Sequence, residues 1–514
     1  MSVSKKKLLQ GSASNMVQLG LSMGVSLVVP PFLVHHMVPA EYSAWVLILQ
    51  LSAYINYLEF GLQTAIGKFV AEHHAAGDRD ASSKVVGTAF TLLSGAALLG
   101  TLAVLVITYD VPLLFHQMPQ NLFHEVRVGT LAIGLSTALM LPFSVFSSIF
   151  TGLQRYIIPG VVLSTSRVVS ASALISLLLL HGSLVAMAML LATTNIATAM
   201  AQFFCWKRYA SHDVPLRLPT FDRRVARRLA EYCGILAIWM VGALFISGLD
   251  TVVVGHFDFA HTGYYAVAAS ATNLMLLIVG NVFGPLLPAM SSIQGERTPE
   301  QMGALLTKTT RYSTLLVCAL AISLFVCGFP VLTVWLGRGY ASRSLIFLEI
   351  LVLANAIRQL GYPYALMVIA MGKQRLATVA PVAEAIVNFA VSIWLAHKFG
   401  AIGVAIGTMV GAVVGIAAHL AISMYLTRNV IRVQRLRFIR TAFLRPLLCA
   451  LPTVALYPFW HRLSLVPMSP LALTLWVVST LLIAWLYGIN AGERVSIRHW
   501  LGRLVYSFKL TAPQ

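Results

Sequence analysis

Residues 85–107, VVGTAFTLLSGAALLGTLAVLVI, decide the fold class because this run of 23 residues carries no charge. A helix needs about 20 apolar residues to cross the hydrocarbon core of a bilayer. Comparable runs recur along the chain and predict an all-α polytopic membrane protein with about 14 transmembrane helices. The expected spans are residues 14–35, 44–62, 85–107, 127–150, 158–180, 184–206, 232–255, 264–287, 312–335, 344–370, 377–396, 401–426, 441–459 and 469–488.

The composition excludes most other classes of protein. The chain has 514 residues, of which 58% are hydrophobic and 10% are charged. Soluble domains carry roughly 25% charged residues. So few charges cannot cover the surface of an ordinary soluble enzyme. The composition is also unlike that of a disordered chain or a fibrous protein. No loop between the expected spans reaches the roughly 50 residues that an independent domain needs.

The distribution of basic residues predicts the orientation. The net charge of +19 comes from 36 Lys and Arg against 17 Asp and Glu. With the N-terminus in the cytoplasm, most Lys and Arg residues fall in cytoplasmic loops, in agreement with the positive-inside rule. This predicts an even number of spans and two cytoplasmic termini, and it explains the charge without a nucleic-acid partner. The densest basic segment, residues 207–228, is either a topological signal or an amphipathic helix on anionic headgroups.

A repeat with an offset of 220 residues divides the chain. GLQR at residues 152–155 recurs as GKQR at residues 372–375, and each follows a span that contains a proline. Residues 37–47 match residues 257–267 more loosely. Because six is an even number, two six-helix copies cross the membrane in the same sense, as a parallel repeat about an axis along the membrane normal.

The repeat predicts five segments. They are an N-terminal six-helix lobe (1–206), a basic cytoplasmic linker (207–231), a C-terminal six-helix lobe (232–430), two additional transmembrane helices (431–490) and a cytoplasmic tail (491–514). In a repeat of this kind, a cavity is expected between the lobes.

Several short segments carry a family resemblance. They are EFGL (59–62) followed by KFVAE (68–72), PLLP (285–288) and GAIG (400–403). With the two lobes and two extra helices, they resemble the polysaccharide transporter branch of the multidrug/oligosaccharidyl-lipid/polysaccharide flippase superfamily. Members of this branch move lipid-linked oligosaccharides across the bacterial inner membrane for O-antigen, capsule or exopolysaccharide assembly.

The resemblance implies a function and a set of partners. The chain is expected to be a multi-pass protein of the bacterial inner membrane that flips a polyprenyl-pyrophosphate-linked oligosaccharide to the outer leaflet by alternating access. Its expected partners are this cargo, the membrane lipids, a polysaccharide polymerase and other assembly proteins. Coupling to H⁺ or Na⁺ is also expected.

Two arginines lie near the middle of expected spans, where an ionisable group is costly and usually faces a cavity or a partner. Arg167 lies in the span 158–180. Arg358 lies in the span 344–370, with Asn355 and Tyr362 on its face of the helix. A guanidinium binds phosphate oxygens in pairs, so these four residues are the candidate binding residues for the implied cargo. Alternatively, either arginine pairs permanently with an acid and only pins the lobes.

The acidic candidates lie in other spans. Asp250 lies in the span 232–255, and Glu384 lies in the span 377–396 with Asn388 one turn later. These residues are expected either to balance the arginines or to carry a coupling ion. Glu59 and Glu349 lie closer to the ends of their spans, where solvation is the simpler interpretation.

Other features of the spans are structural in our interpretation. Gly403, Gly407, Gly411 and Gly415 form a ladder at spacing four, which lets another helix approach closely. His419 is expected to pack rather than to relay protons. None of the five cysteines has a His at metal-ligand spacing, so neither a metal nor another cofactor is expected.

Three alternatives remain open. An ion-coupled multidrug or organic cation antiporter of the same superfamily is expected, by resemblance, to carry an acid in its first span, and residues 14–35 have none. A lipid II flippase is expected to carry charges there too. A membrane enzyme usually displays catalytic groups on a large outer loop, whereas residues 108–126 carry only dispersed acids and histidines. The sequence therefore favours a transporter over an enzyme.

Overall fold

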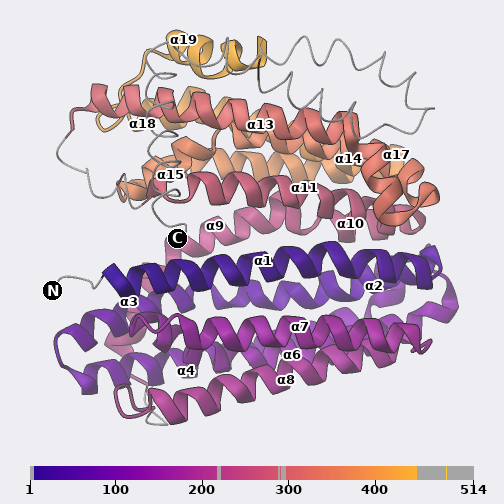
Figure 1. Ribbon diagram of the computed structural model, residues 1–514, viewed down its shortest axis with the longest axis horizontal. Helices are drawn as coiled ribbons and strands as arrows, with labels where there is room; N and C mark the ends of the chain where they lie inside the picture. The colour runs from indigo at the N-terminus through magenta and orange to yellow at the C-terminus, as the bar shows by residue number, and fades with distance from the viewer. Residues whose placement is uncertain (1–4, 217–220, 288–289, 291–296, 449–481, 483–514) are drawn as a thin grey trace, which may run out of the picture. The chain divides into compact units, whose positions relative to one another are not determined.

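The computed structural model describes residues 5–216, 221–287, 290, 297–448 and 482. Within these residues the chain forms helices joined by turns and contains no strand, so the all-α prediction is confirmed (Figure 1). Residues 449–459 of the predicted span 441–459, all of the predicted span 469–488 except residue 482, and the predicted tail lie outside the described residues. The count of 14 spans and the orientation therefore stay predictions.

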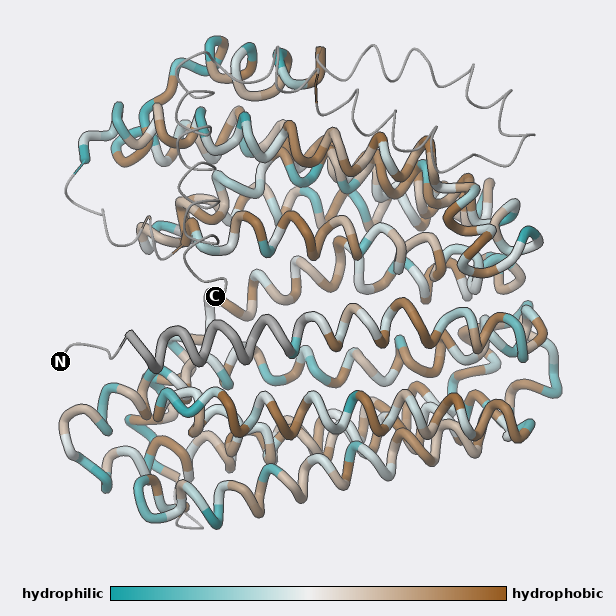
Figure 2. Tube along the Cα trace, in the orientation of Figure 1, coloured by the Kyte–Doolittle hydropathy of each residue, from teal (hydrophilic) through white to brown (hydrophobic). Residues whose placement is uncertain are grey.

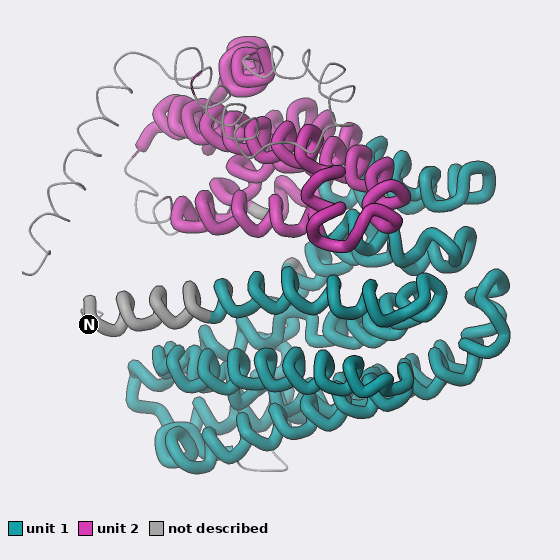
Figure 3. The backbone as a smooth tube through the Cα atoms, turned by 45° about the vertical axis from the view of Figure 1, so that its right-hand side comes forward, with its two compact units in different colours: residues 1–270, 381–411 teal, residues 271–380, 412–514 magenta. Residues whose placement is uncertain are grey.

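Two compact units divide the chain (Figure 3): unit 1 comprises residues 1–270 and 381–411, and unit 2 comprises residues 271–380 and 412–514. Unit 1 contains α1 (Lys5–His36), α2 (Pro39–Ala53), η1 (Tyr54–Glu59), α3 (Leu62–Ala75), α4 (Arg79–Tyr109), α5 (Val111–Leu114), α6 (Gln120–Gly152), α7 (Ile157–Leu179), α8 (Leu184–Tyr209), α9 (Arg223–Ala243), η2 (Leu244–Gly248), α10 (Asp250–Phe257) and η3 (Phe259–His261). Unit 2 contains α13 (Pro299–Leu336), α14 (Arg338–Gln359), α15 (Tyr362–Ala370), α16 (Gln374–Ala377), η4 (His419–Ser423), α18 (Met424–Leu426), α19 (Arg435–Phe438) and η5 (Ile439–Leu444). The helices α11 (Thr262–Phe283) and α17 (Val379–Ala418) are each divided between the two units. The boundaries of the predicted lobes stay a prediction.

Ten helical segments within the described residues are long and apolar enough to cross a membrane. The segment Arg375–Leu426 holds two of the predicted spans, because α17 turns at Gly400. A shorter apolar helix, Gly20–His36, corresponds to the first predicted span. In Figure 2, hydrophobic residues fill the middle of most long helices, and hydrophilic residues gather at their ends.

The surface of α4 shows why these helices suit a bilayer. Leu98, Leu99, Leu102 and Val106 lie on this helix with more than half of each side chain exposed. Their spacing of three and four residues places most of them on one face. An extended apolar face exposed on a helix of 31 residues is costly in water and favourable against lipid tails.

The basic start of α9 packs against α3 within unit 1. The Arg228 guanidinium at the start of α9 lies 3.1 Å from a Glu72 carboxylate oxygen on α3, and the Lys68 ammonium lies 4.5 Å from the Tyr232 ring centroid. Residues 223–231, predicted as part of a linker, therefore form the first turns of a helix that packs on α3. Leu229 on this helix is fully buried in the core of unit 1, so at least this apolar face contacts protein rather than headgroups.

Two residues related by the repeat offset of 220 contact each other within unit 1. The backbone N–H of Gly263 donates a hydrogen bond to Ser43 Oγ at 3.1 Å. A Cβ built on Gly263 would lie 2.8 Å from Tyr42 Cδ1, so only glycine permits this approach. Equivalent positions of a repeat contact each other when they lie beside its two-fold axis, and this contact supports the repeat.

The predicted glycine ladder packs where a second helix approaches closely. Gly400 adopts φ 56° and ψ −136° inside α17, which reverses the chain into a helical hairpin. A Cβ on Gly403 or Gly407 would overlap the backbone at Leu395 or Ser392 on the first leg of the hairpin. The prediction that the ladder admits a close helix is therefore confirmed at these positions.

Two predicted spans are interrupted rather than continuous. The span 232–255 changes from α9 into the π-helical turn η2 and restarts as α10 at Asp250. The span 344–370 ends as α14 at Gln359 and restarts as α15 at Tyr362. Pro363 lies at the start of α15, where its missing N–H costs no hydrogen bond.

Candidate functional site

Asp250 lies at the restart of an interrupted helix in unit 1. It is the first residue of α10, where the positive end of the helix dipole favours a carboxylate. Its side chain is 7% exposed, and its Oδ2 accepts hydrogen bonds from the Thr408 hydroxyl at 3.0 Å and the Tyr265 hydroxyl at 3.2 Å. The two donors satisfy the Oδ2 of a carboxyl group that water cannot reach freely.

The interruption before Asp250 exposes backbone carbonyls that side chains then satisfy. The Gly248 carbonyl accepts hydrogen bonds from Gln50 Nε2 at 2.9 Å and from the Tyr54 hydroxyl at 2.7 Å. The Ile246 carbonyl accepts a hydrogen bond from Asn388 Nδ2. Carbonyl oxygens released at a broken membrane helix are typical ligands for cations in transporters. Here protein donors already occupy the two acceptor positions of the Gly248 carbonyl, so Gln50 and Tyr54 replace helix hydrogen bonds that the interruption removes.

Asn388 joins this group from the first leg of the α17 hairpin. Its side chain is fully buried, and its Oδ1 accepts a hydrogen bond from the Ser392 hydroxyl at 2.9 Å. A Cβ on Gly411 of the second leg would lie 2.6 Å from Asn388 Cβ. The structure thus brings Asp250 and Asn388 into one polar cluster through η2 and the hairpin.

Glu384 lies one helical turn before Asn388 on α17. Its side chain is 7% exposed, and its neighbours in the sequence are mainly apolar. A buried carboxylate inside a membrane helix is costly unless it has a partner or a function. Its position beside the cluster suits the charge-balancing role expected for it.

Arg358 lies at the second interruption, in unit 2. It occupies the last turn of α14, where the negative end of the helix dipole favours a cation. Its Nη1 donates to Asn355 Oδ1 at 2.6 Å, and Asn355 Nδ2 donates to the Leu351 carbonyl at 2.9 Å. The Asn355 side chain therefore holds the guanidinium; Arg358 as a residue is half-buried, and its Nη2 is enclosed by protein.

Tyr362 lies just beyond the same interruption. Its hydroxyl is directed toward Gly280 on α11, where a built Cβ would lie 3.8 Å away. The ring is partly exposed and packs among apolar residues of unit 2. The structure thus gathers Arg358, Asn355 and Tyr362 around one break in a membrane-spanning helix.

Arg167 belongs to unit 1 and contacts the first helix of that unit. It lies in the interior of α7, is exposed, and donates a hydrogen bond to Ser22 Oγ on α1. Ser22 in turn donates to the Gln18 carbonyl at 2.7 Å. The structure therefore brings Arg167 together with none of the other candidates through a recorded hydrogen bond.

His419 behaves as a packing residue. Its ring lies edge-to-face against Tyr364 with the centroids 5.3 Å apart, and a Cβ on Gly361 would lie 3.0 Å from its Cδ2. The Tyr364 hydroxyl lies 2.8 Å from Thr427 Oγ1. These contacts fix η4 against α15 behind the helix break.

Sequence reasoning missed four residues of the Asp250 cluster: Gln50, Tyr54, Tyr265 and Thr408. Single polar residues in apolar helices give a weak signal, because most of them satisfy a carbonyl on their own helix. Gly248, two residues before Asp250 in an expected span, was the available sign of an interrupted helix. Within the described part of the chain, no group of three or more His, Cys, Asp or Glu residues lies close enough to hold a metal ion.

Known proteins resemble the chain in sequence and in fold. The probable low-salt glycan biosynthesis flippase Agl15 of Haloferax volcanii is 22% identical over 192 residues, which are 37% of this chain and 40% of that protein. The chain therefore matches about two fifths of the length of this curated relative.

Solved structures share the fold over most of the chain. The lipid II flippase MurJ, in an inward closed conformation, superimposes with a TM-score of 0.69 and 13% identity over 93% of this chain and 98% of that chain. A multidrug resistance MATE family transporter of the MOP superfamily, in an inward-facing conformation, gives a TM-score of 0.62 and 13% identity over 78% of this chain and 98% of that chain. At this identity the likeness establishes the fold.

The family model described as polysaccharide biosynthesis protein matches residues 39–345. This region takes in the first of the two helix interruptions and Asp250. Because the match covers more than half of the residues, the chain belongs to the polysaccharide biosynthesis protein family.

Proposed function

We propose that the protein is a flippase that moves a polyprenyl-pyrophosphate-linked oligosaccharide from the cytoplasmic to the outer leaflet of the bacterial inner membrane. The cargo would serve O-antigen, capsule or exopolysaccharide synthesis. Membership of a polysaccharide biosynthesis family supports this proposal, as does a fold like that of a lipid II flippase. The partial match to a glycan biosynthesis flippase points the same way.

The observation that carries the proposal is the position of Arg358. Arg358 is a half-buried residue at a break in a membrane-spanning helix, and its guanidinium donates a hydrogen bond to Asn355. A planar guanidinium forms paired hydrogen bonds with phosphate oxygens. In our proposal Arg358 binds the pyrophosphate, and Tyr362 borders the same break. Arg167 supplies a second guanidinium contact with the cargo.

The polar cluster of Asp250 and Asn388, together with Glu384, supplies the second part of the mechanism. Asp250, Glu384 and Asn388 balance the arginines when no cargo is bound, or they carry a coupling H⁺ or Na⁺. Alternating access then exposes the cargo first to one side of the membrane and then to the other. In the structural alternative, Arg167 or Arg358 pairs permanently with an acid and does not bind cargo.

A second candidate function is an ion-coupled multidrug or organic cation antiporter. The likeness to a MATE family transporter over 78% of the chain favours it. An organic cation is favoured by acidic residues in its cargo site, whereas the group at the α14–α15 break contains the cation Arg358. The lipid-linked glycan is therefore the preferred cargo.

The test is flipping in proteoliposomes. A short-chain polyprenyl-pyrophosphate sugar is reconstituted with the full-length protein, and an impermeant lectin or glycosidase reports its exposure. We expect Arg358→Gln to slow flipping by at least about tenfold, because a charge-assisted hydrogen bond contributes about 1.5–3 kcal/mol. Arg167→Gln is expected to slow it as well.

Arg79→Gln is the matched control, since Arg79 is exposed in the first turn of α4, outside the candidate groups. Flipping that survives both Arg358→Gln and Arg167→Gln would favour the structural alternative. Wild-type protein that flips no prenyl-linked sugar would overturn the proposed function.

A further inference from the structure

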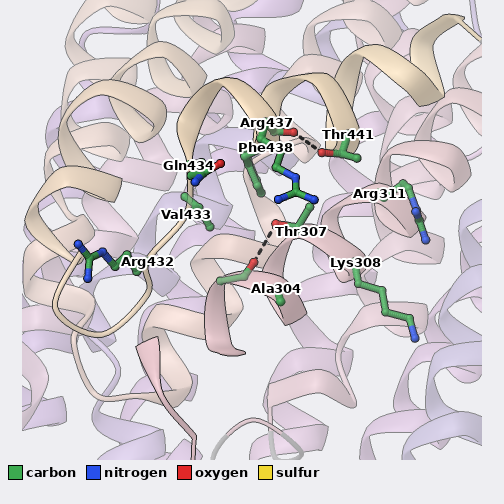
Figure 4. Close-up of a pocket in the computed structure, with 11 residues that line it drawn as sticks. Ala304, Thr307, Lys308, Arg311, Arg432, Val433, Gln434, Arg437, Phe438 and Thr441 are labelled. Carbon is green, nitrogen blue, oxygen red and sulfur yellow. Dashed lines mark hydrogen bonds between the residues drawn. The ribbon is translucent and has the colours of Figure 1, made fainter. Parts of the chain in front are cut away.

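A pocket of about 390 Å³ lies within unit 2, between α13 and the segment 432–441 (Figure 4). Its lining residues come from α13 and from a segment more than 120 positions later that runs from the turn before α19 into η5. They are Gly303, Ala304, Thr307, Lys308, Arg311, Arg432, Val433, Gln434, Arg437, Phe438 and Thr441. None of the helix breaks described above contributes to it.

The lining is strongly cationic. Lys308, Arg311, Arg432 and Arg437 contribute four positive charges, and none of the described lining residues is acidic. Arg311 is 5% exposed. Lys308 and Arg437 form no ion pair with any residue that the structure describes. Arg432 is compensated by Glu300, whose carboxylate oxygen lies 3.2 Å away. The charges of Lys308 and Arg437 adjoin the same volume, so an anion is the occupant that this pocket stabilises.

The walls of the pocket are held together by the backbone. The Arg432 N–H donates to the Pro299 carbonyl at 2.9 Å, and an Arg432 Nη1 lies 3.2 Å from a Glu300 carboxylate oxygen. A Cβ on Gly303 would overlap the Arg432 carbonyl oxygen. The absence of a side chain at Gly303 thus lets the segment after α18 lie directly on α13.

The position along α13 indicates the kind of anion. Residues 312–336 carry no charge, and a span needs about 20 apolar residues. Arg311 precedes this run directly, and Lys308 lies one turn earlier, about 4–5 Å along the helix axis. The pocket therefore borders the apolar segment at the depth where lipid headgroups carry their phosphates.

We propose that this pocket binds the phosphate of an anionic lipid headgroup. The Arg437 guanidinium and the Lys308 ammonium suit a phosphodiester or a diphosphate, because a guanidinium can bind two oxygens and an ammonium can donate to a third. A volume of about 390 Å³ equals that of roughly 13 liquid water molecules, which is ample for such a group. The lipid is either a membrane phospholipid or the lipid-linked cargo, and only the second case rests on the proposed function.

The test measures binding rather than transport. The full-length protein in phosphatidylcholine nanodiscs is titrated calorimetrically with dioctanoyl phosphatidylglycerol and, separately, with farnesyl diphosphate. We expect Lys308→Gln/Arg437→Gln to weaken binding of the preferred lipid by at least roughly tenfold. The matched control is Lys373→Gln/Arg440→Gln, which removes two exposed charges of unit 2 that do not line the pocket.

Preference for phosphatidylglycerol would identify a membrane phospholipid as the ligand, and preference for farnesyl diphosphate would identify the cargo. The charge-conserving variant Lys308→Arg/Arg437→Lys is expected to retain binding, which separates loss of charge from misfolding. Equal binding by wild type and by Lys308→Gln/Arg437→Gln, or no binding of either lipid, would overturn the proposal. Flipping by the same preparations is a separate readout, so failure of the proposed function leaves this binding test intact.

Discussion

The α17 hairpin gives a sharp test of how the polar cluster is assembled, through the substitution Gly407→Ala. Gly407 lies on the second leg of the hairpin, next to Thr408, whose hydroxyl donates to Asp250. The first leg carries Asn388 and Ser392 in the same cluster. Any separation of the legs therefore moves the partner of Asp250 away from Asn388.

The expected magnitude follows from the contact distance. A Cβ built on Gly407 would lie 2.6 Å from both Cα and N of Ser392. Favourable carbon contacts lie at about 3.5–4.0 Å, so the legs must separate by roughly 1 Å. Overpacking costs about 1–3 kcal/mol, and the upper end applies because backbone atoms cannot rotate away. Alanine regains about 1 kcal/mol of helix propensity, which leaves a net loss of about 2 kcal/mol.

Reversible unfolding in mixed detergent and SDS micelles, followed by tryptophan fluorescence, measures this loss. Gly95→Ala is the control, since a Cβ on Gly95 in α4 would meet nothing within 4 Å. We expect the control to be unchanged or stabilised by up to about 1 kcal/mol. If Gly407→Ala is as stable as the wild type while Gly95→Ala behaves as described, the two legs of the α17 hairpin are not packed as closely as we infer.

Three further outcomes follow from the structure of unit 1. Asp250→Asn keeps an oxygen acceptor for the Thr408 and Tyr265 hydroxyls, so we expect normal folding with flipping reduced at least about tenfold. Asp250→Leu removes the acceptor, so it should also lower the free energy of unfolding by about 2 kcal/mol in the same micelle assay. Gly263→Ala should cost about 1–3 kcal/mol because its Cβ would press on the Tyr42 ring, and an unchanged unfolding midpoint would contradict this contact. At the start of α9, the N–H groups of Val225 and Arg224 lower the pKa of Asp222. The Asp222 cap is therefore fully effective above the unfolded pKa of about 3.9 and is lost as the pH falls through the lower folded value. Hydrogen exchange of the first turn of α9, corrected for its intrinsic pH dependence, should accelerate in acid for the wild type and not for Asp222→Asn.

Local patterns in the sequence predicted the membrane helices well. An uncharged run of about 20 residues has few alternatives to a membrane helix, because the bilayer requires internal satisfaction of every backbone group. The turn at Gly400 and the close packing of Gly403 and Gly407 followed from the same kind of local rule. These features depend on the local sequence and not on contacts with residues that are distant in the sequence.

The helix interruptions depended on distant residues and were not predictable in this way. The π turn before Asp250 is stabilised where Gln50, Tyr54 and Asn388 donate to its carbonyls, from positions 142 to 198 residues away. Only the fold brings these donors together, and the sequence alone gives no signal that pairs them. The sequence singled out Asp250 as an acid inside an expected span, but its partners Thr408 and Tyr265 could be found only from the structure.

We claim above all that the protein moves a lipid-linked glycan. Parallel transport assays with two different cargoes test this most directly. Proteoliposomes of the wild-type protein are assayed for flipping of a short-chain polyprenyl-pyrophosphate sugar and, in parallel, for ion-driven efflux of an organic cation dye. We predict that an impermeant glycosidase reaches the inner-leaflet sugar only when the protein is present, and that dye efflux stays at the level of protein-free liposomes. Ion-driven dye efflux with no protein-dependent exposure of the sugar would contradict the account and identify a cation antiporter.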